Sequence, residues 1–211
     1  MCSKGKEVHL GFTGETFPPG IHMCYIYNDE AQRKNVISKF LESGLLSGEK
    51  TSYFMDVITI DEMNEYFSTL GLDRLLREHE GRFSVATTKD TYYPSDTFVP
   101  DEMLDRLGVF YTRSIQEGYT GARMSGEMSW AVRNIPGCSR LIEYEARVND
   151  VLLTYPVNTI CQYNARLFDG ALLFDVLSVH PMMIVHGQIV KNPYYIKPEE
   201  FLKDYSARKQ E

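Results

Sequence analysis

Apolar residues recur along the chain with two different periods, and together these predict strands and helices in alternation. Residues 22–27 form a short continuous apolar run, which is typical of a buried strand. Residues 30–46 carry apolar side chains at helical spacing, and Asn28 or Asp29 is a suitable cap for that helix. Further strands are predicted at residues 53–58, 83–87, 122–125, 156–162, 182–185 and 188–190. Further helices are predicted at residues 61–70, 72–79, 101–117, 139–152 and 167–179, and a charged amphipathic one from residue 198 onward.

The order of these elements predicts the fold class. Strands that are separated by helices of about ten or more residues are joined by parallel crossovers. We therefore expect an α/β protein with a doubly wound, mostly parallel sheet and helices on both faces. Residues 1–20 are polar and rich in turns, and residues 88–100 are predicted to form a long loop, a feature that is often functional. No repeat, low-complexity tract or linker divides residues 1–211, so a single domain is expected.

Composition and charge narrow the class of protein. The 211 residues have a hydrophobic fraction of 43% and a formal net charge of −7, which fits one soluble globular domain. The acidic balance, with no Lys/Arg cluster longer than a pair, argues against direct binding to nucleic acid. No apolar run approaches the ~18 residues of a membrane span and no signal peptide is recognisable, so we expect a cytoplasmic protein without membrane contact. The four cysteines form no CxxC pair, which predicts neither disulfides nor a zinc site.

Residues 44–51 approximate the phosphate-binding pattern GxxxxGK[ST], but they do not support nucleotide chemistry. The segment lies between a predicted helix and a strand, whereas a phosphate loop leads from a strand into the N-terminus of a helix. The position after the first strand has no glycine and carries Asp29 and Glu30, whose carboxylates repel a triphosphate. We therefore expect neither ATP nor GTP hydrolysis.

Candidate ligand-binding residues follow the strands, at the edge where open parallel sheets bind ligands. They are Tyr27 and Asp29 after the first strand, Arg123, Glu127 and Trp130 after a central strand, and Tyr163 after a later one. We expect Glu127 to orient Arg123 and Trp130 to form an apolar wall, an arrangement that suits a small, mostly apolar ligand. The alternative is structural, with an Arg–Glu pair that braces the crossover and Trp130 in the core.

Thiol chemistry and metal binding have less support in the sequence. A nucleophilic thiolate at Cys161 requires a neighbouring base or cation, and nothing in the sequence places His180 beside it. A buried Cys161 that packs as a small apolar side chain is the favoured interpretation. The five histidines never occur as HxH or HxxxH, so no metal site is predicted, nor any cofactor or catalytic residue.

Several sequence blocks resemble a known family. Residues 19–27, 123–130, 144–149, 161–163, 180–181 and 192–195 are similar, in the same order, to the methanogen/methylotroph sensory domain (MEDS). The resemblance covers about residues 17–196 and leaves 197–211 as a C-terminal charged helix. It implies a divergent RecA-like fold without a functional phosphate loop, and a sensory role. The family includes the input domain of a dichloromethane-responsive repressor and domains attached to histidine kinases, and it is proposed to detect C1 or hydrocarbon-derived compounds.

The sequence thus predicts a stand-alone cytoplasmic sensor that binds a small organic molecule. No effector module is recognisable beyond residue 200, so we expect the signal to pass through a separate partner, a kinase or a transcription regulator. An enzyme is the first alternative, either nucleotide-dependent or based on the Cys161 thiol. A structural interaction protein, such as a homodimer, is the second.

Overall fold

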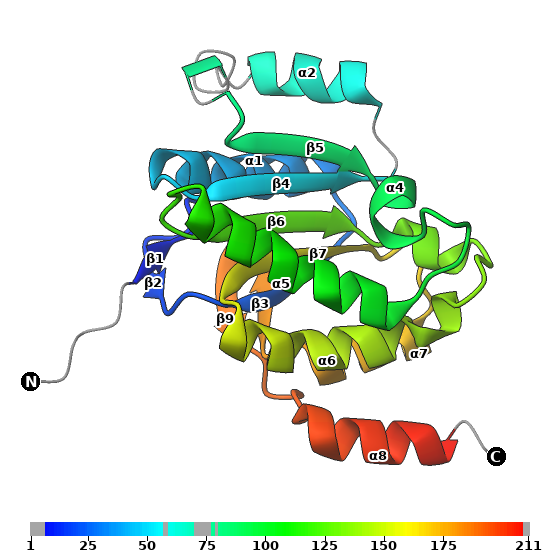
Figure 1. Cartoon of the computed structure of the whole chain (residues 1–211). Helices are drawn as coiled ribbons and strands as arrows, with labels where there is room; N and C mark the ends of the chain where they lie inside the picture. The colour runs from blue at the N-terminus through cyan, green and yellow to red at the C-terminus, as the bar shows by residue number, and fades with distance from the viewer. Residues whose placement is uncertain (1–6, 57–58, 70–76, 79, 209–211) are drawn as a thin grey trace, which may run out of the picture.

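The computed structural model describes residues 7–56, 59–69, 77–78 and 80–208, and its centre is a mostly parallel sheet (Figure 1). The sheet has seven strands in the order β5-β4-β6-β7-β3-β8-β9. In chain order they are β3 (His22–Tyr27), β4 (Lys50–Met55), β5 (Phe83–Thr87), β6 (Ala122–Glu127), β7 (Val157–Asn164), β8 (Met182–Val185) and β9 (Gln188–Lys191). Neighbouring strands from β5 to β8 run parallel, and β9 runs antiparallel to β8.

Helices cover both faces of this sheet. Helix α1 (Glu30–Leu46) packs on one face against β4 and β6, and α2 (Ile60–Thr69) lies beyond the β5 edge (Figure 1). The other face carries α5 (Pro100–Gln116), α6 (Leu141–Thr154) and α7 (Gly170–Val179). Helix α8 (Pro198–Arg208) packs outside α6 and α7. The predicted doubly wound α/β fold is confirmed.

Two apolar cores follow from the alternation of side chains along the strands. Met23 and Tyr25 of β3 belong to the core beneath α1. Cys24 of the same strand and Tyr163 of β7 belong to the core beneath α6 and α7. The buried strand predicted at residues 22–27 and the helix predicted at residues 30–46 coincide with β3 and α1.

Helix starts follow local sequence signals. The Asp29 carboxylate accepts a hydrogen bond from the Gln32 backbone N–H at 2.9 Å and caps α1. Asp169 caps α7 in the same way, through the N–H of Leu172 at 2.8 Å. Pro100 is the first residue of α5, where its missing N–H costs nothing.

The structure adds to or differs from three local predictions. Residues 1–20 were described only as polar and rich in turns, but β1 (Val8–His9) and β2 (Thr16–Phe17) form a small antiparallel pair there. The loop expected at residues 88–100 begins with a helix, α4 (Thr88–Tyr92), because the Thr87 hydroxyl caps it through the Asp90 N–H at 3.0 Å. Strand β6 runs two residues further than predicted, to Glu127. The helix predicted at residues 72–79 lies largely outside the described residues.

No described helix combines the length and the apolar character that crossing a bilayer requires.

Candidate functional site

A buried polar cluster occupies the carboxyl edge of the sheet, where β3, β4, β6 and β7 end together. Its centre is Arg33 of α1, whose Nη1 donates to Glu127 Oε1 at 2.9 Å and to Gln162 Oε1 at 3.0 Å. The Tyr53 hydroxyl donates to the same carboxylate oxygen. The guanidinium carbon of Arg33 lies 5.2 Å from the centroid of the Tyr27 ring. We call these five residues the Arg33 cluster.

The Arg33 cluster is buried, and its hydrogen bonds extend to two neighbours: Arg33 Nε donates to Glu30 Oε2 at 2.7 Å, and the Asp56 N–H donates to Glu127 Oε2 at 2.8 Å. Arg33 and Glu127 are each only 1% exposed, so their ion pair is a buried one. Burial and the adjacent Glu127 carboxylate raise the pKa of the Tyr53 hydroxyl well above its usual range, which keeps Tyr53 protonated as a donor. Sequence reasoning found Tyr27 and Glu127 but missed Arg33, because a charged residue within an amphipathic helix usually faces water.

The helix end beside this cluster already holds an anionic group. The N-terminus of a helix that follows the first strand is the phosphate site of nucleotide-binding loops. Here the exposed Asp29 carboxylate takes the free N–H of Gln32. The near-match at residues 44–51 lies where α1 ends and β4 begins, in the reversed order that the sequence predicted. Asp29 thus caps the helix end at which a phosphate binds in nucleotide-binding loops, and the Arg33 cluster lies beside it.

Arg123 does not belong to this edge, and its predicted pairing with Glu127 is wrong. It is the second residue of β6, and its Nε donates to Glu49 Oε2 at 2.6 Å. Its other nitrogens donate to the carbonyls of Phe40 at 2.6 Å and His9 at 2.9 Å. Because β6 extends to Glu127, the two residues lie at opposite ends of the strand.

Trp130 is a core residue, and its predicted role as a pocket wall is wrong. It lies in a 3-10 helix (Ser129–Val132) after β6 and is 0% exposed. Its ring centroid is 4.8 Å from that of Phe98 and 5.0 Å from that of Tyr92. The segment predicted as a loop folds over the indole and supplies both of these rings.

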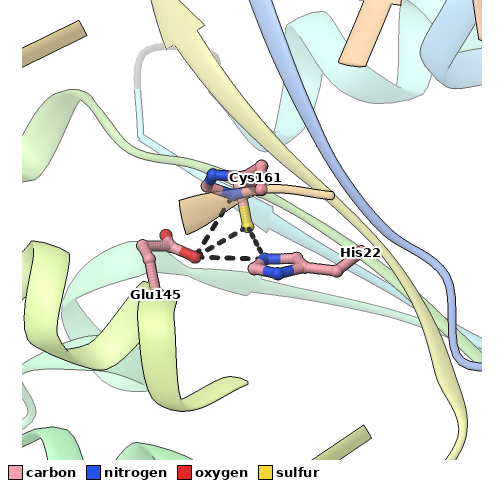
Figure 2. A group of neighbouring side chains, drawn as sticks. His22, Glu145 and Cys161 are labelled. Carbon is pink, nitrogen blue, oxygen red and sulfur yellow. Dashed lines mark hydrogen bonds and ion pairs between the residues drawn. The ribbon is translucent and has the colours of Figure 1, made fainter. Parts of the chain in front are cut away.

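A second buried cluster lies between the sheet and α6, and we call it the His–Cys–Glu cluster: His22, Glu145, Cys161 and His180. Figure 2 shows the first three converging from β3, α6 and β7. The Glu145 Oε2 atom is 3.2 Å from His22 Nε2, 3.5 Å from Cys161 Sγ and 3.5 Å from His180 Nε2. Cys161 Sγ is 3.6 Å from His22 Nε2. His180 follows the end of α7.

Burial controls the charges in this cluster. It lowers the pKa of the His22 imidazole, and the neighbouring His180 adds to that effect. Burial and the Glu145 carboxylate raise the pKa of the Cys161 thiol well above its usual range. Burial alone would raise the pKa of Glu145, but its contacts with His180 and His22 outweigh this and lower it. The carboxylate is therefore the charged member, and Cys161 is a thiol.

Tyr163 joins this cluster rather than the carboxyl edge. It lies within β7, is fully buried, and its hydroxyl donates to Glu145 Oε1 at 2.8 Å. No local pattern predicts this grouping, because its members come from separate elements and share no spacing along the chain. The chemical identity of the side chains, two imidazoles with a thiol and a carboxylate, was the one available signal.

The described residues line several cavities, among them one of about 580 Å³ between α5 and the end of α6. Two others bear on the function. The first, which we call the α5 groove, measures about 370 Å³ and lies between α5 and strands β4, β5 and β6. Its apolar lining is Phe54, Met103, Leu107, Val109, Phe110 and Met124, and its polar lining is Lys50, Ser52, Ser84, Thr91, Arg106, Arg113 and Glu117. The second, of about 170 Å³, lies at the carboxyl ends of β3 and β8 and includes the predicted Tyr27 and also Met183.

The chain has a RecA-like α/β fold. It is similar to the crystal structure of a KaiC-like protein from Pyrococcus horikoshii OT3, with a TM-score of 0.59 and 16% identity over 86% of this chain and 80% of that one. It is also similar to the flagellar accessory protein FlaH from Methanocaldococcus jannaschii, with a TM-score of 0.57 and 15% identity over 87% of this chain and 83% of that one.

Within this class the chain belongs to the MEthanogen/methylotroph, DcmR Sensory domain (MEDS) family, which matches residues 21–181. It is 25% identical over 161 residues to the transcriptional repressor DcmR of Methylorubrum extorquens (strain DSM 6343 / CIP 106787 / DM4). The match covers 75% of this chain and 57% of the repressor, so the chain spans a little over half of that protein's length. The family resemblance predicted from the sequence is confirmed, and with it a sensory role.

Proposed function

We propose that this chain senses a small C1 or hydrocarbon-derived molecule that binds in the α5 groove, and that it signals through a separate regulatory protein. The observation that carries the proposal is the groove itself. Its volume of about 370 Å³ lies within the range of small-molecule sites, and it combines apolar walls with a few polar groups. Ser52 and Ser84 contribute hydroxyls that lie 2.5 Å apart on adjacent strands.

Competing functions have less support from the site chemistry. The buried Arg33–Glu127 ion pair and the Asp29 cap occupy the edge that nucleotide hydrolysis would need. A thiol enzyme would require an accessible thiolate, whereas the Cys161 thiol has a raised pKa and lies beneath α6. We therefore propose a binding protein without catalytic activity.

Helix α5 offers a route from the groove to a partner. It lines the groove, and its apolar residues Val109 and Ile115 are 58% and 42% exposed. A ligand that shifts α5 changes this surface and the contact of α5 with α6. The similarity to DcmR, a transcriptional repressor, supports a transcription regulator as the output.

The test is a thermal-shift screen with halomethanes, methanol, methylamine and methanethiol. A compound that binds only the native state at about 100 times its Kd stabilises that state by about 2.7 kcal/mol. For a domain of this size the melting temperature should then rise by about 5–10 °C.

A pair of adjacent variants locates the binding. Ser84→Phe places a ring in the groove, whereas Val85→Phe places it on the opposite face of the same strand. We expect Ser84→Phe to lose at least half of the ligand-induced shift and Val85→Phe to keep it. No shift with any compound, or equal loss in both variants, contradicts the proposal.

A further inference from the structure

We infer that His22, Glu145, Cys161 and His180 form a closed binding site for one divalent transition-metal ion of borderline softness, such as Zn²⁺. The inference concerns a different part of the molecule from the α5 groove and does not depend on the proposed function. Four observations carry it: donor spacing, the tautomers of the two histidines, the chemistry of the donor set, and the residues that orient it.

Four of the six distances between the donor atoms match those around a tetrahedral ion. Zinc binds sulfur at about 2.3 Å and nitrogen or oxygen at about 2.0–2.2 Å, so donors at the corners of the tetrahedron lie about 3.2–3.8 Å apart. Glu145 Oε2 is 3.2 Å from His22 Nε2, 3.5 Å from Cys161 Sγ and 3.5 Å from His180 Nε2. Cys161 Sγ to His22 Nε2 is 3.6 Å, and all four donor atoms lie within 4.8 Å of one another.

The hydrogen bonds of His180 leave a lone pair directed into this space. Its Nδ1 lies 2.7 Å from the Val176 carbonyl oxygen, which can only accept, so Nδ1 carries the proton. In the neutral ring, Nε2 is then an acceptor, and it faces the Glu145 carboxylate, another acceptor. This fully buried nitrogen has no hydrogen-bond partner among the residues that the structure describes.

The same reasoning applies to His22. The side-chain amide nitrogen of Asn149 donates to the carbonyls of Glu145, Ala146 and Val179, which fixes the orientation of that amide. Its Oδ1 therefore accepts from His22 Nδ1 at 3.0 Å, and His22 Nε2 presents a second lone pair to Glu145.

With both rings neutral, two imidazole lone pairs and a carboxylate oxygen converge, and the Cys161 S–H is the donor directed at that oxygen, at 3.5 Å. A metal ion satisfies all three acceptors at once.

The donor set also selects the ion. Sulfur and imidazole nitrogen disfavour Mg²⁺ and Ca²⁺, which prefer oxygen, and suit zinc and its neighbours in the first transition row. On binding, the Cys161 S–H bond breaks, the sulfur bonds the metal as a thiolate, and the proton passes to solvent. One thiolate, one carboxylate and two neutral imidazoles then balance the charge of a divalent ion.

Surrounding groups hold the donors in place. Asn149 and the Val176 carbonyl orient the two imidazoles, and the Tyr163 hydroxyl binds the other Glu145 oxygen at 2.8 Å. With four protein ligands and full burial, the site has the closed form of structural zinc centres. The ion would tie β3 and β7 to α6 and to the end of α7.

In the experiment, protein that has been treated with a chelator is titrated with Zn²⁺ and, separately, with Co²⁺. The absorption spectrum of bound Co²⁺ depends on its ligands and geometry. We expect one equivalent per chain, tetrahedral Co²⁺ bands with a thiolate charge-transfer band, displacement of Co²⁺ by Zn²⁺, and a higher melting temperature with either ion. Cys161→Ser should abolish the charge-transfer band, and His180→Gln should weaken Zn²⁺ binding at least 100-fold.

Cys24→Ser is the matched control, because Cys24 pairs in register with Cys161 on the neighbouring strand but lies outside the donor set. It should keep both the band and the stoichiometry. Tyr163→Phe removes only the hydrogen bond to Glu145 and should weaken binding by about 10–100-fold, which provides a readout if a ligand variant fails to fold. Failure of the chelator-treated wild type to bind one equivalent overturns the inference, as does a charge-transfer band that survives Cys161→Ser or disappears in Cys24→Ser.

Discussion

Replacing Arg123 by methionine should destabilise the protein strongly without affecting ligand response. The methionine keeps most of the aliphatic stem but removes the guanidinium from Glu49 and from the carbonyls of Phe40 and His9. Glu49 is 2% exposed and would keep only a long hydrogen bond from Asn158, at 3.4 Å. Breaking a buried ion pair by removing one partner costs about 3–5 kcal/mol.

For a domain of 150–250 residues, each kcal/mol moves the melting temperature by about 2–4 °C, so Arg123→Met should lower it by about 6–20 °C. Circular dichroism measures the melting temperature during heating and the free energy of unfolding in a urea titration. Arg147→Met is the control, because Arg147 pairs with Asp101 at the surface and should cost less than about 1 kcal/mol.

A double variant distinguishes the cost of the stranded Glu49 carboxylate from the loss of the other Arg123 contacts. Adding Glu49→Leu to Arg123→Met removes the stranded carboxylate and should recover part of the lost stability. The structural role of Arg123 is refuted if the unfolding free energy of Arg123→Met lies within about 1 kcal/mol of the wild-type value and the variant loses its ligand-induced thermal shift. That result would mean that Arg123 contacts the ligand.

Three further predictions test the core and the phosphate edge. Trp130→Phe should cost about 1–3 kcal/mol of unfolding free energy in urea and leave the ligand-induced shift unchanged. Gly126→Ala should cost a similar amount by the same measurement, because the added Cβ would lie 2.2 Å from the Tyr92 hydroxyl, whereas Gly170→Ala meets no atom within 4 Å and should be nearly neutral. Calorimetric titration with Mg²⁺-ATP should show no binding, and phosphate release should not exceed a blank, because the Asp29 carboxylate takes the helix N–H that a phosphate would use and repels its charge.

The sheet and its helices could be predicted because local patterns determine them. Strand β3 is a continuous apolar run, and α1 has both a helical apolar stripe and an Asp29 cap. Helix α4 has a local cap at Thr87, but it is only five residues long, and its Tyr92 is buried against Trp130, a contact between distant parts of the chain that no local pattern predicts.

The candidate sites were less predictable, since they depend on where each strand ends. Extending β6 by two residues carries Glu127 to the carboxyl edge and leaves Arg123 near the amino end. From the sequence, Arg33 is expected on the solvent face of its helix, whereas in the structure it is buried and donates to Glu127. His22 and His180 stand far apart in sequence, and the sheet with its covering helices brings them together.

The most direct test of ligand binding in the α5 groove uses isotope-labelled methionine methyl groups as NMR reporters. Met103 and Met124 line the groove, Met183 lines the smaller cavity at the carboxyl edge, and Met23 lies in the core beneath α1. During titration with a compound that raises the melting temperature, we expect the methyl signals of Met103 and Met124 to shift saturably while those of Met183 and Met23 stay in place. Saturable shifts at Met183, with Met103 and Met124 unmoved, would contradict the account and place the ligand at the carboxyl edge instead.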